Sequence, residues 1–428
     1  MRNRLCCCKK GILGLLGFCC AVVCGWAEEP VYTPQPCVDF QVRGGIGNTL
    51  ERLEAGETVR VAYLGGSITM ANGWRVKTTQ WLRETWPQAT IVEIAAGVSG
   101  TGSLLGNYRL ERDVLQHEPD LLLVEFAVND GGTPPQRIWQ QMEGIVRKTW
   151  GANPRTDIVF VYTFCVPFAK TVREGILPTS AGAMEMLAEF YGIPSIHWLK
   201  RVVALESAGK LVFQTSEEPK KGELWFSQDG THPLDAGHEL YREGIAQAFQ
   251  AMKSIPPVLH DVSQKPTFVS NPMIFTEMRS VDSLKMEGDW RKLATGEKCY
   301  GFTSRLDDIW TTDEPGASVT FSFRGTQAML YDVVGPDGGQ IAVTVDGILR
   351  KEPLPRTDAY CLQYNSWRVT AVVLADGLDA EKVHTVTVEL LPEEPNRAKI
   401  GNDPKWVEKY PGRHLRFSKI LVRGEFCR

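Results

Sequence analysis

Residues 58–252 alternate between short, continuously apolar runs and longer stretches with apolar positions at helical spacing. The apolar runs are rich in β-branched residues, which is typical of strands that are buried on both faces. They cover residues 58–64, 90–96, 120–128, 157–164 and 193–198. Amphipathic stretches, which favour helices, cover residues 74–86, 103–117, 135–150 and 233–252. This order predicts a parallel sheet with helices on both of its faces.

Beyond residue 252 the alternation of strands and helices ends. Residues 256–272 are rich in Pro, Ser and polar side chains and predict a linker without regular structure. Apolar, β-branched segments separated by turn sequences such as GPDGG follow the linker. They cover residues 317–325, 327–334, 339–350, 367–377, 382–391 and 415–424. We therefore predict two domains, an α/β domain at 38–255 and an all-β sandwich or jelly roll at 273–428.

The first 27 residues have the layout of a secretory signal peptide. Basic residues come first, an apolar run from Gly11 to Val23 follows, and Gly25 and Ala27 are small residues at a cleavage site. We expect cleavage after Ala27 and an exported protein, whether secreted, periplasmic or on the cell surface. A membrane anchor is the alternative, but the run is short for a bilayer, so we expect no stable membrane span. A lipoprotein signal at Cys24 is disfavoured because Val23 stands where a small residue is expected.

Composition narrows the classes of partner and cofactor. The chain of 428 residues has a formal net charge of -4, which argues against binding of nucleic acid as its general function. Five of the 11 cysteines lie after the signal, and none of these forms a C-x-x-C pair. The sequence therefore predicts no metal site and no cofactor. Export would permit disulfides, and buried free thiols are the alternative.

Four loops of the α/β domain carry residues suited to one chemistry. GGSIT follows the first strand with Ser67, AAGVSGTGS follows the second with Gly97, and AVND follows the third with Asn129. DGTHP precedes the last helix and contains Asp229 and His232. Because ligands of such sheets bind at the carboxyl ends of the strands, we expect all five residues around one crevice.

Acyl transfer from an ester requires these residue types. Ser67 is the candidate nucleophile, and a neutral His232 imidazole would accept its proton. Asp229 would hold the imidazole in the required tautomer and stabilise the imidazolium that forms. The backbone amides of Ser67 and Gly97 and the side-chain amide of Asn129 are candidate oxyanion donors, each typically worth ~3 kcal/mol of barrier.

Each residue also has an ordinary structural interpretation. Ser67 suits a helix N-cap, Asn129 suits an Asx turn, and glycines are common in turns. Ser99 and Ser103 are alternative nucleophiles, but both lie beyond the strand end in a Gly-rich loop. Asp235 is an alternative partner for the histidine, although its position also favours the first turn of the last helix. The order of the four loops at strand ends favours the catalytic interpretation.

In this order the four loops resemble the blocks of the SGNH or GDSL-like hydrolase superfamily. The first block often reads G-D-S, and here it reads GGSIT with Ser67 in the nucleophile's position. Gly97 and Asn129 match the family's oxyanion donors, although Ala127 replaces a glycine of the third block. The last block, D-x-x-H, is complete. The resemblance covers the first domain and implies a flavodoxin-like sheet with a serine nucleophile after its first strand.

The second domain resembles the jelly-roll domain of certain carbohydrate esterases, where it usually precedes the hydrolase module. We therefore expect a secreted serine esterase that removes O-acetyl or other short acyl groups from an acylated glycan or a small ester. A lipase or thioesterase with the same residues is one alternative, and residues 166–180 are its only candidate lid. A glycan-binding protein with an inactive hydrolase domain is another, and acetyl transfer between glycans also stays open. Aromatic residues suited either to sugar stacking or to a core are Trp225, Phe226, Trp290, Trp310 and Trp367.

Overall fold

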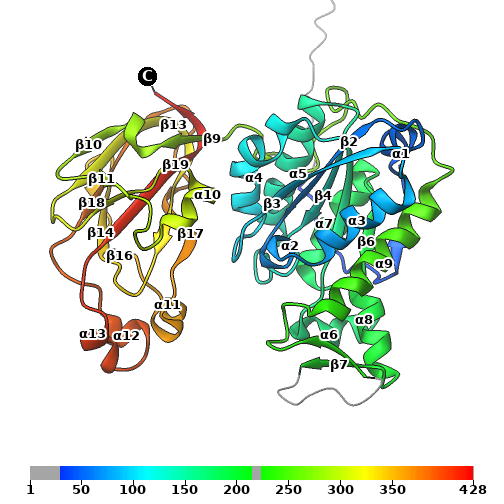
Figure 1. Cartoon of the computed structure of the whole chain (residues 1–428). Coiled ribbons are helices and arrows are strands. Elements are labelled where there is room, and N and C mark those ends of the chain that lie inside the picture. Colours follow the sequence, from blue (N-terminus) through cyan, green and yellow to red (C-terminus); the bar gives the residue numbers. More distant parts are fainter. Residues whose placement is uncertain (1–28, 215–222, 428) are drawn as a thin grey trace, which may run out of the picture.

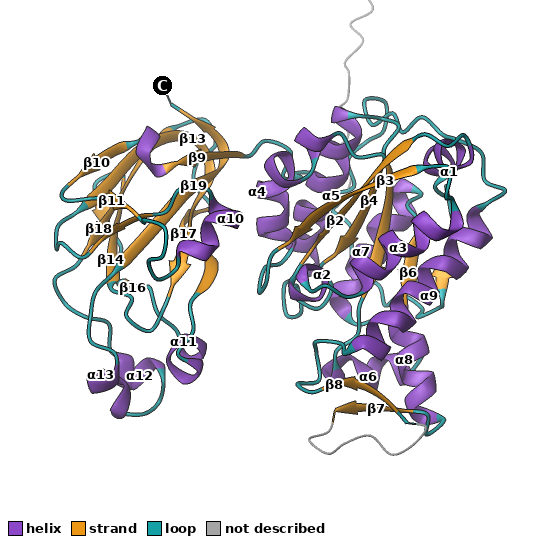
Figure 2. Ribbon diagram, in the orientation of Figure 1, coloured by secondary structure: helices purple, strands orange, loops and turns teal. Residues whose placement is uncertain are grey.

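The computed structural model describes residues 29–214 and 223–427, so the predicted signal peptide, residues 1–27, lies outside the described residues. Figures 1 and 2 show an α/β domain with a β-rich domain beside it. This arrangement confirms the predicted fold class, a flavodoxin-like parallel sheet followed by an all-β sandwich. Within the described residues, no helix is both long and apolar enough to cross a bilayer.

The sheet of the first domain has the strand order β1-β6-β5-β4-β2-β3. Its strands are β1 (Phe40–Gln41), β2 (Thr58–Gly65), β3 (Thr90–Gly97), β4 (Leu121–Glu125), β5 (Asp157–Tyr162) and β6 (Ser195–His197). All pairs are parallel except that of β1 with β6. Gly65, the last residue of β2, pairs with Gly97 on one side and with Glu125 on the other. Three strands therefore end level with one another at the edge where the candidate loops begin.

Helices cover both faces of this sheet, as the alternating pattern predicts (Figure 2). The longer helices are α1 (Gly47–Glu54), α3 (Trp74–Thr85), α4 (Ser103–Asp113), α5 (Pro135–Ala152), α7 (Thr179–Tyr191), α8 (Trp198–Ser207) and α9 (Asp235–Met252). Helix α5 packs between α4 and α7, whereas α9 packs against α3 and α8. A parallel pair, β7 (Leu211–Gln214) and β8 (Leu224–Ser227), lies outside the main sheet and precedes the last helix.

The second domain is organised by two long strands, β13 (Ser318–Val334) and β19 (Leu415–Phe426). The first half of β13 pairs with β10 (Lys285–Glu287) and β18 (Val383–Leu390), and its second half pairs with β17 (Arg368–Asp376) and β19. Gly325 of β13 has a φ of 153°, and a Cβ there would lie 2.1 Å from the carbonyl oxygen of Arg423. A glycine is therefore required where β13 passes from one layer of the sandwich to the other.

Shorter elements complete this domain. The strands are β9 (Glu277–Ser280), β11 (Arg291–Lys292), β12 (Trp310–Thr312), β14 (Gln340–Val345), β15 (Ile348–Leu349) and β16 (Leu354–Pro355). The helices are α10 (Thr303–Leu306), α11 (Ala359–Tyr364), α12 (Arg397–Ile400) and α13 (Lys405–Lys409). A core that includes Val319, Phe321 and Phe417 fills the space between the layers.

The segment predicted as a linker, 256–272, contains no helix or strand but is packed on the first domain. The imidazole of His260 stacks on Trp150 with ring centroids 4.5 Å apart. The buried carboxylate of Glu143 accepts hydrogen bonds from the backbone amides of Phe268 and Val269 at 2.6 and 2.9 Å. The α/β domain therefore depends structurally on residues beyond the end of α9.

The β-rich domain lies on the α4 side of the first domain (Figure 1), and buried apolar side chains of both domains form one cluster there. Leu105 and Tyr108 of α4 belong to one buried cluster with Met329 and Tyr331 of β13. The Tyr108 hydroxyl donates to the side-chain oxygen of Gln327 at 2.9 Å. The domains thus contact each other through packed side chains as well as through the chain connection.

The described cysteines are all free thiols. They are Cys37, Cys165, Cys299, Cys361 and Cys427. Cys37, Cys165 and Cys361 are buried, and burial raises the pKa of each of these three thiols to between about 11 and about 12. The sequence left disulfides and free thiols open as alternatives, and the described cysteines are free thiols.

Candidate active site

Ser67 is the first residue of a one-turn helix, α2 (Ser67–Met70), which directly follows β2. The two glycines before it are required by close packing. A Cβ at Gly65 would lie 2.3 Å from the Thr69 hydroxyl oxygen, and one at Gly66 would lie 2.0 Å from the side-chain oxygen of Asn129. The GGS sequence therefore lets the chain turn tightly at the strand end and present the serine hydroxyl above the sheet.

His232 connects Ser67 to Asp229 in a linear relay. Its Nε2 lies 2.7 Å from the Ser67 Oγ, and its Nδ1 lies 2.6 Å from the Asp229 Oδ2. A serine that donates to Nε2 and a carboxylate that accepts from Nδ1–H define one neutral tautomer of the imidazole. The side chains of His232 and Asp229 are 51% and 55% exposed, so the relay is accessible to a substrate.

The loop between β8 and α9 holds Asp229 as an anion. Its carboxylate accepts hydrogen bonds from the backbone amides of Thr231 and His232, at 2.9 and 2.8 Å, and from the Ser227 hydroxyl at 2.9 Å. Partial burial raises the pKa of Asp229, but the hydrogen bonds from the His232 side chain and from these donors outweigh it and bring the pKa well below its usual range. The Asp229 carboxylate is therefore charged at neutral pH.

The alternative residues considered from the sequence do not bond to the His232 imidazole. Asp235 forms an ion pair with Lys77 at 2.8 Å rather than with the histidine. Ser103 is fully buried, and its hydroxyl donates to Gln141 at 2.7 Å. The Ser99 hydroxyl lies 3.4 Å from the sulfur of Met70. Only Ser67 of the three candidate serines is hydrogen-bonded to an imidazole within the described residues.

Two of the candidate oxyanion donors adjoin the turn at Gly66 and Ser67. Asn129 lies directly beside Gly66, because its side-chain oxygen is 2.0 Å from the position of a Cβ there. Gly97 ends β3, and a Cβ there would lie 2.4 Å from the backbone nitrogen of Met70, so packing of β3 on α2 is sufficient to explain this glycine. The roles of the Ser67 amide, Gly97 and Asn129 as oxyanion donors stay predictions.

Asp130, next to Asn129, and Arg368 of the second domain contact the loop after β3. Asp130 is buried and accepts a hydrogen bond from the backbone amide of Ser103 at 3.0 Å. Burial raises the pKa of Asp130 to about 6. Gly100 has a φ of 70°, and Arg368 from the second domain comes within 3.4 Å of the position of a Cβ there. A guanidinium of the β-rich domain therefore lies against a loop of the candidate active site.

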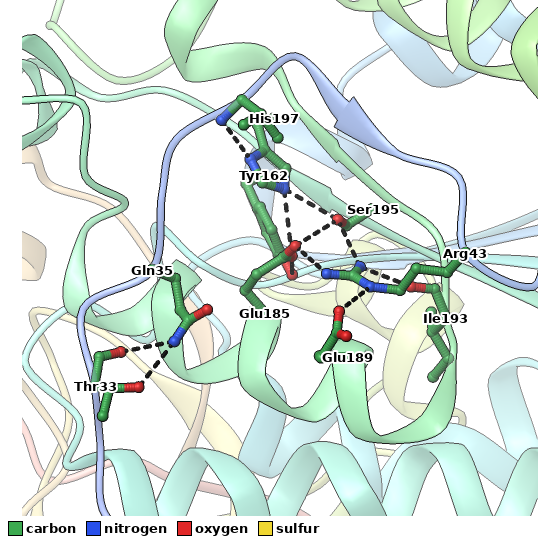
Figure 3. A network of polar contacts seen from close by, with 10 residues as sticks. Thr33, Gln35, Arg43, Tyr162, Glu185, Glu189, Ile193, Ser195 and His197 are labelled. Carbon is green, nitrogen blue, oxygen red and sulfur yellow. Dashed lines mark hydrogen bonds and ion pairs between the residues drawn. The ribbon is translucent and has the colours of Figure 1, made fainter.

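A second group of serine, histidine and acid lies inside the first domain (Figure 3). The Ser195 hydroxyl lies 3.0 Å from the Nε2 of His197 and 3.1 Å from the Oε1 of Glu185. Arg43 forms an ion pair with the same carboxylate, and the Tyr162 hydroxyl donates to it at 2.8 Å. Ser195 and His197 are 0% and 1% exposed, so this group is enclosed by protein and is a structural network.

Comparisons with known proteins identify the family of the first domain. A family model described as the GDSL-like lipase/acylhydrolase family matches residues 63–240, which include Ser67, Gly97, Asn129, Asp229 and His232. The first domain is a GDSL-like hydrolase domain. The chain is accordingly a carboxylic ester hydrolase. A comparison with curated protein sequences gives no significant match.

The GDSL-like domain and the β-rich domain together resemble solved two-domain enzymes. One is a two-domain esterase, CEX, active on acetylated mannans and co-crystallised with mannopentaose. It shares 21% sequence identity over 93% of this chain and 100% of that chain, with a TM-score of 0.69. A second structure of an esterase with the same description shares 21% identity over 89% of this chain and 95% of that one, with a TM-score of 0.67. At this identity the likeness establishes the two-domain fold, with the β-rich domain placed after the hydrolase domain.

Proposed function

We propose that this chain is an exported serine esterase that removes acetyl or other short acyl groups from a carbohydrate. Ser67 acts as the nucleophile, His232 as the base and Asp229 as the residue that orients the base. The single observation that carries this proposal is the exposed relay of 2.7 and 2.6 Å from Ser67 through His232 to Asp229. The predicted signal peptide supports export.

The geometry supports a two-step hydrolysis. The Ser67 Oγ attacks the ester carbonyl carbon while His232 Nε2 takes the hydroxyl proton, and the oxyanion accepts hydrogen bonds from the Ser67 and Gly97 amides and from Asn129. Collapse of this intermediate breaks the bond to the sugar oxygen, which leaves as an alcohol with the proton from His232. Water, deprotonated by the same imidazole, then attacks the acyl-serine, and the acid and free serine are released.

The carbohydrate substrate is supported by the resemblance of both domains to an esterase active on acetylated mannans. We extend this to acetylated glycans as a class. The aromatic residues singled out from the sequence do not form an open surface for a sugar. Phe226 is fully buried and Trp225 beside it is half-buried, Trp290 and Trp310 pack against the core of the sandwich, and Trp367 packs at the domain interface.

A different aromatic pair is available near the active-site loop. Tyr360 and Tyr364 of α11 are 52% and 59% exposed, with ring centroids 4.8 Å apart. The Arg368 guanidinium lies 5.8 Å from the centroid of the Tyr360 ring and also approaches Gly100 of the active-site loop. Exposed aromatic faces beside a guanidinium suit the faces and hydroxyl groups of a sugar. We propose that this group binds a glycan chain extending from Ser67.

An ester panel on the purified protein tests the proposal. Aryl acetate should be hydrolysed faster than aryl octanoate, and acetylated mannan and acetyl-xylan should release acetate. Ser67→Ala should remove these activities while leaving the circular dichroism spectrum unchanged. Octanoate hydrolysed faster than acetate would favour the lipase alternative, and full activity of Ser67→Ala would overturn the mechanism.

A further inference from the structure

Glu125 is a fully buried carboxyl directly beneath the nucleophile turn, and acyl transfer as proposed above assigns it no role. It is the last residue of β4 and pairs with Gly65, the last residue of β2. The described residues give this side chain three hydrogen-bond donors, two threonine hydroxyls and one backbone amide, and none of them is charged. Burial of a carboxyl without a cationic partner is costly, so the contacts it makes require an explanation.

Two of the three donors flank Ser67 in the chain. The backbone amide of Gly66, one residue before the serine, donates to the Glu125 carboxyl, and so does the hydroxyl of Thr69 at 2.9 Å, two residues after it. One side chain therefore holds the turn on both sides of the serine. The amide at the start of a helix has no partner within the helix, and here a neighbouring strand supplies one.

The third donor anchors the carboxyl to the next strand. The Thr163 hydroxyl, which directly follows β5, donates to the Oε1 of Glu125 at 2.8 Å. Thr69 and Thr163 are both fully buried, so neither hydroxyl has water as an alternative partner. The ends of β2, β4 and β5 are thus connected through one carboxyl group.

We propose that Glu125 is a positioning residue that fixes Ser67 in line with His232 and thereby sets the rate of acyl transfer. It acts through Gly66 and Thr69 and touches neither the substrate nor the imidazole. Displacement of a reacting group by about 1 Å can cost roughly 100-fold in rate, so loss of these hydrogen bonds should lower kcat. KM for a small ester should change little, because no contact with the substrate is removed.

Glu125→Gln and Glu125→Ala test the proposal on the full chain. We expect kcat on aryl acetate to fall roughly 10- to 100-fold in Glu125→Gln and further in Glu125→Ala, with KM within about twofold of wild type. The glutamine keeps one acceptor oxygen and so should rescue part of the loss. Phosphonylation of Ser67 by an organophosphonate should slow in parallel, because it depends on the same placement of the hydroxyl.

Glu143→Gln is the matched control, because Glu143 is also a fully buried carboxylate of the first domain. It accepts hydrogen bonds from the Tyr191 hydroxyl and from the amides of Phe268 and Val269, away from the four loops. This variant should lower the thermal midpoint without lowering kcat. Equal losses of kcat in Glu125→Gln and Glu143→Gln would overturn the proposal, as would unchanged kcat in Glu125→Gln.

Thr69 provides a second test if the Glu125 variants do not fold. Thr69→Val removes one donor to the carboxyl, whereas Thr69→Ser keeps the hydroxyl, so kcat should be lower in the valine variant than in the serine variant. Equal kcat in the two variants would contradict the proposal. The inference rests on Ser67 being the nucleophile, and activity of Ser67→Ala would refute that assignment separately. Unaffected Glu125→Gln beside an inactive Ser67→Ala would refute only the positioning role.

Discussion

The first domain contains two sets of serine, histidine and acid, and the difference between them shows why we propose a catalytic role for only one. In the exposed set, Ser67 and Asp229 bind opposite nitrogens of the His232 ring. In the buried set, Ser195 and Glu185 both lie within 3.3 Å of one nitrogen of the His197 ring. Only the first arrangement lets the acid orient the imidazole as a base toward the serine.

The other nitrogen of the buried imidazole is also occupied. The backbone amide of Val38 lies 3.3 Å from the His197 Nδ1, so the ring connects the N-terminal segment to β6. Arg43 balances the charge of Glu185 inside the domain. The two sets thus contain the same residue types. They differ in which nitrogen of the imidazole the serine and the acid bind, and in whether solvent reaches them.

The largest expected effect separates the two serines. Ser67→Ala should lower kcat on aryl acetate by about 10,000-fold or more, because the proposed nucleophile is lost. Ser195→Ala should leave kcat unchanged and lower the free energy of unfolding by about 1 kcal/mol, the usual contribution of one hydrogen bond. Steady-state kinetics and urea unfolding measure the two quantities. An organophosphonate that labels Ser195, Ser99 or Ser103 instead of Ser67 would contradict the comparison.

The second prediction compares Asp229 of the exposed set with Glu185 of the buried set. Asp229→Asn should lower kcat by roughly 100- to 10,000-fold, because an amide neither fixes the required tautomer nor stabilises the imidazolium. His232→Ala should lower kcat further than Asp229→Asn. Glu185→Gln should leave kcat unaffected in the same assay. If Asp229→Asn proved harmless, Asp235 would be the next residue to test.

The sequence was sufficient to predict the sheet, the order of its loops and the residues of the exposed set. Continuous apolar runs identify buried strands, and the carboxyl ends of parallel strands share one edge. The buried set was not predicted, because nothing in the sequence brings Arg43 to a carboxylate 142 residues away. One signal was available for Glu125, which is the only acid between Leu121 and Val128, inside an otherwise apolar run.

The contacts of the irregular segments also could not be predicted from the sequence. Residues 256–272 have the composition of a linker, but His260 and Phe268 pack on the first domain, and only the folded chain reveals these contacts. A fragment that ends near Met252 would therefore lose part of the hydrolase domain itself. Point substitutions separate the roles of the two domains more cleanly than truncation.

A third prediction concerns how much Glu185 of the buried set stabilises the folded protein, and how this contribution depends on pH. Burial by itself raises the pKa of Glu185, but the hydrogen bond and charge of His197 and the charge of Arg43 lower it from 4.5 to about 2. Because the folded pKa is depressed, the stabilisation is present above about pH 4.5 and is lost as the pH falls toward about 2. Glu185→Gln should cost about 3 kcal/mol near neutral pH, as expected when one partner of a buried ion pair is removed.

Urea unfolding of wild type and Glu185→Gln at about pH 6 and about pH 3 measures this contribution, and the difference between the two proteins should shrink at the lower pH. Glu189→Gln is the control, because Glu189 binds the same Arg43 at 2.8 Å but is 75% exposed. Its removal should cost less than about 1 kcal/mol. A pH-independent difference for Glu185→Gln would show that the carboxylate is not held as an anion in the folded protein.

The smallest expected effect concerns Arg368 and tests whether the second domain binds the glycan beside the exposed set. The buried set is enclosed within one domain, whereas the loop beside Ser67 faces Arg368 of the other. Arg368→Ala should lower kcat/KM on acetylated mannan by about tenfold, equivalent to about 1.4 kcal/mol, and should lower it less on aryl acetate, which is too small to reach α11. Tyr360→Ala should act in the same direction, since it removes one of the two exposed rings.

Arg350→Ala, at an exposed arginine that donates to the Val373 carbonyl, serves as the control and should change neither value. Equal losses on polymer and aryl acetate would mean that Arg368 supports the loop at Gly100 and does not bind the glycan.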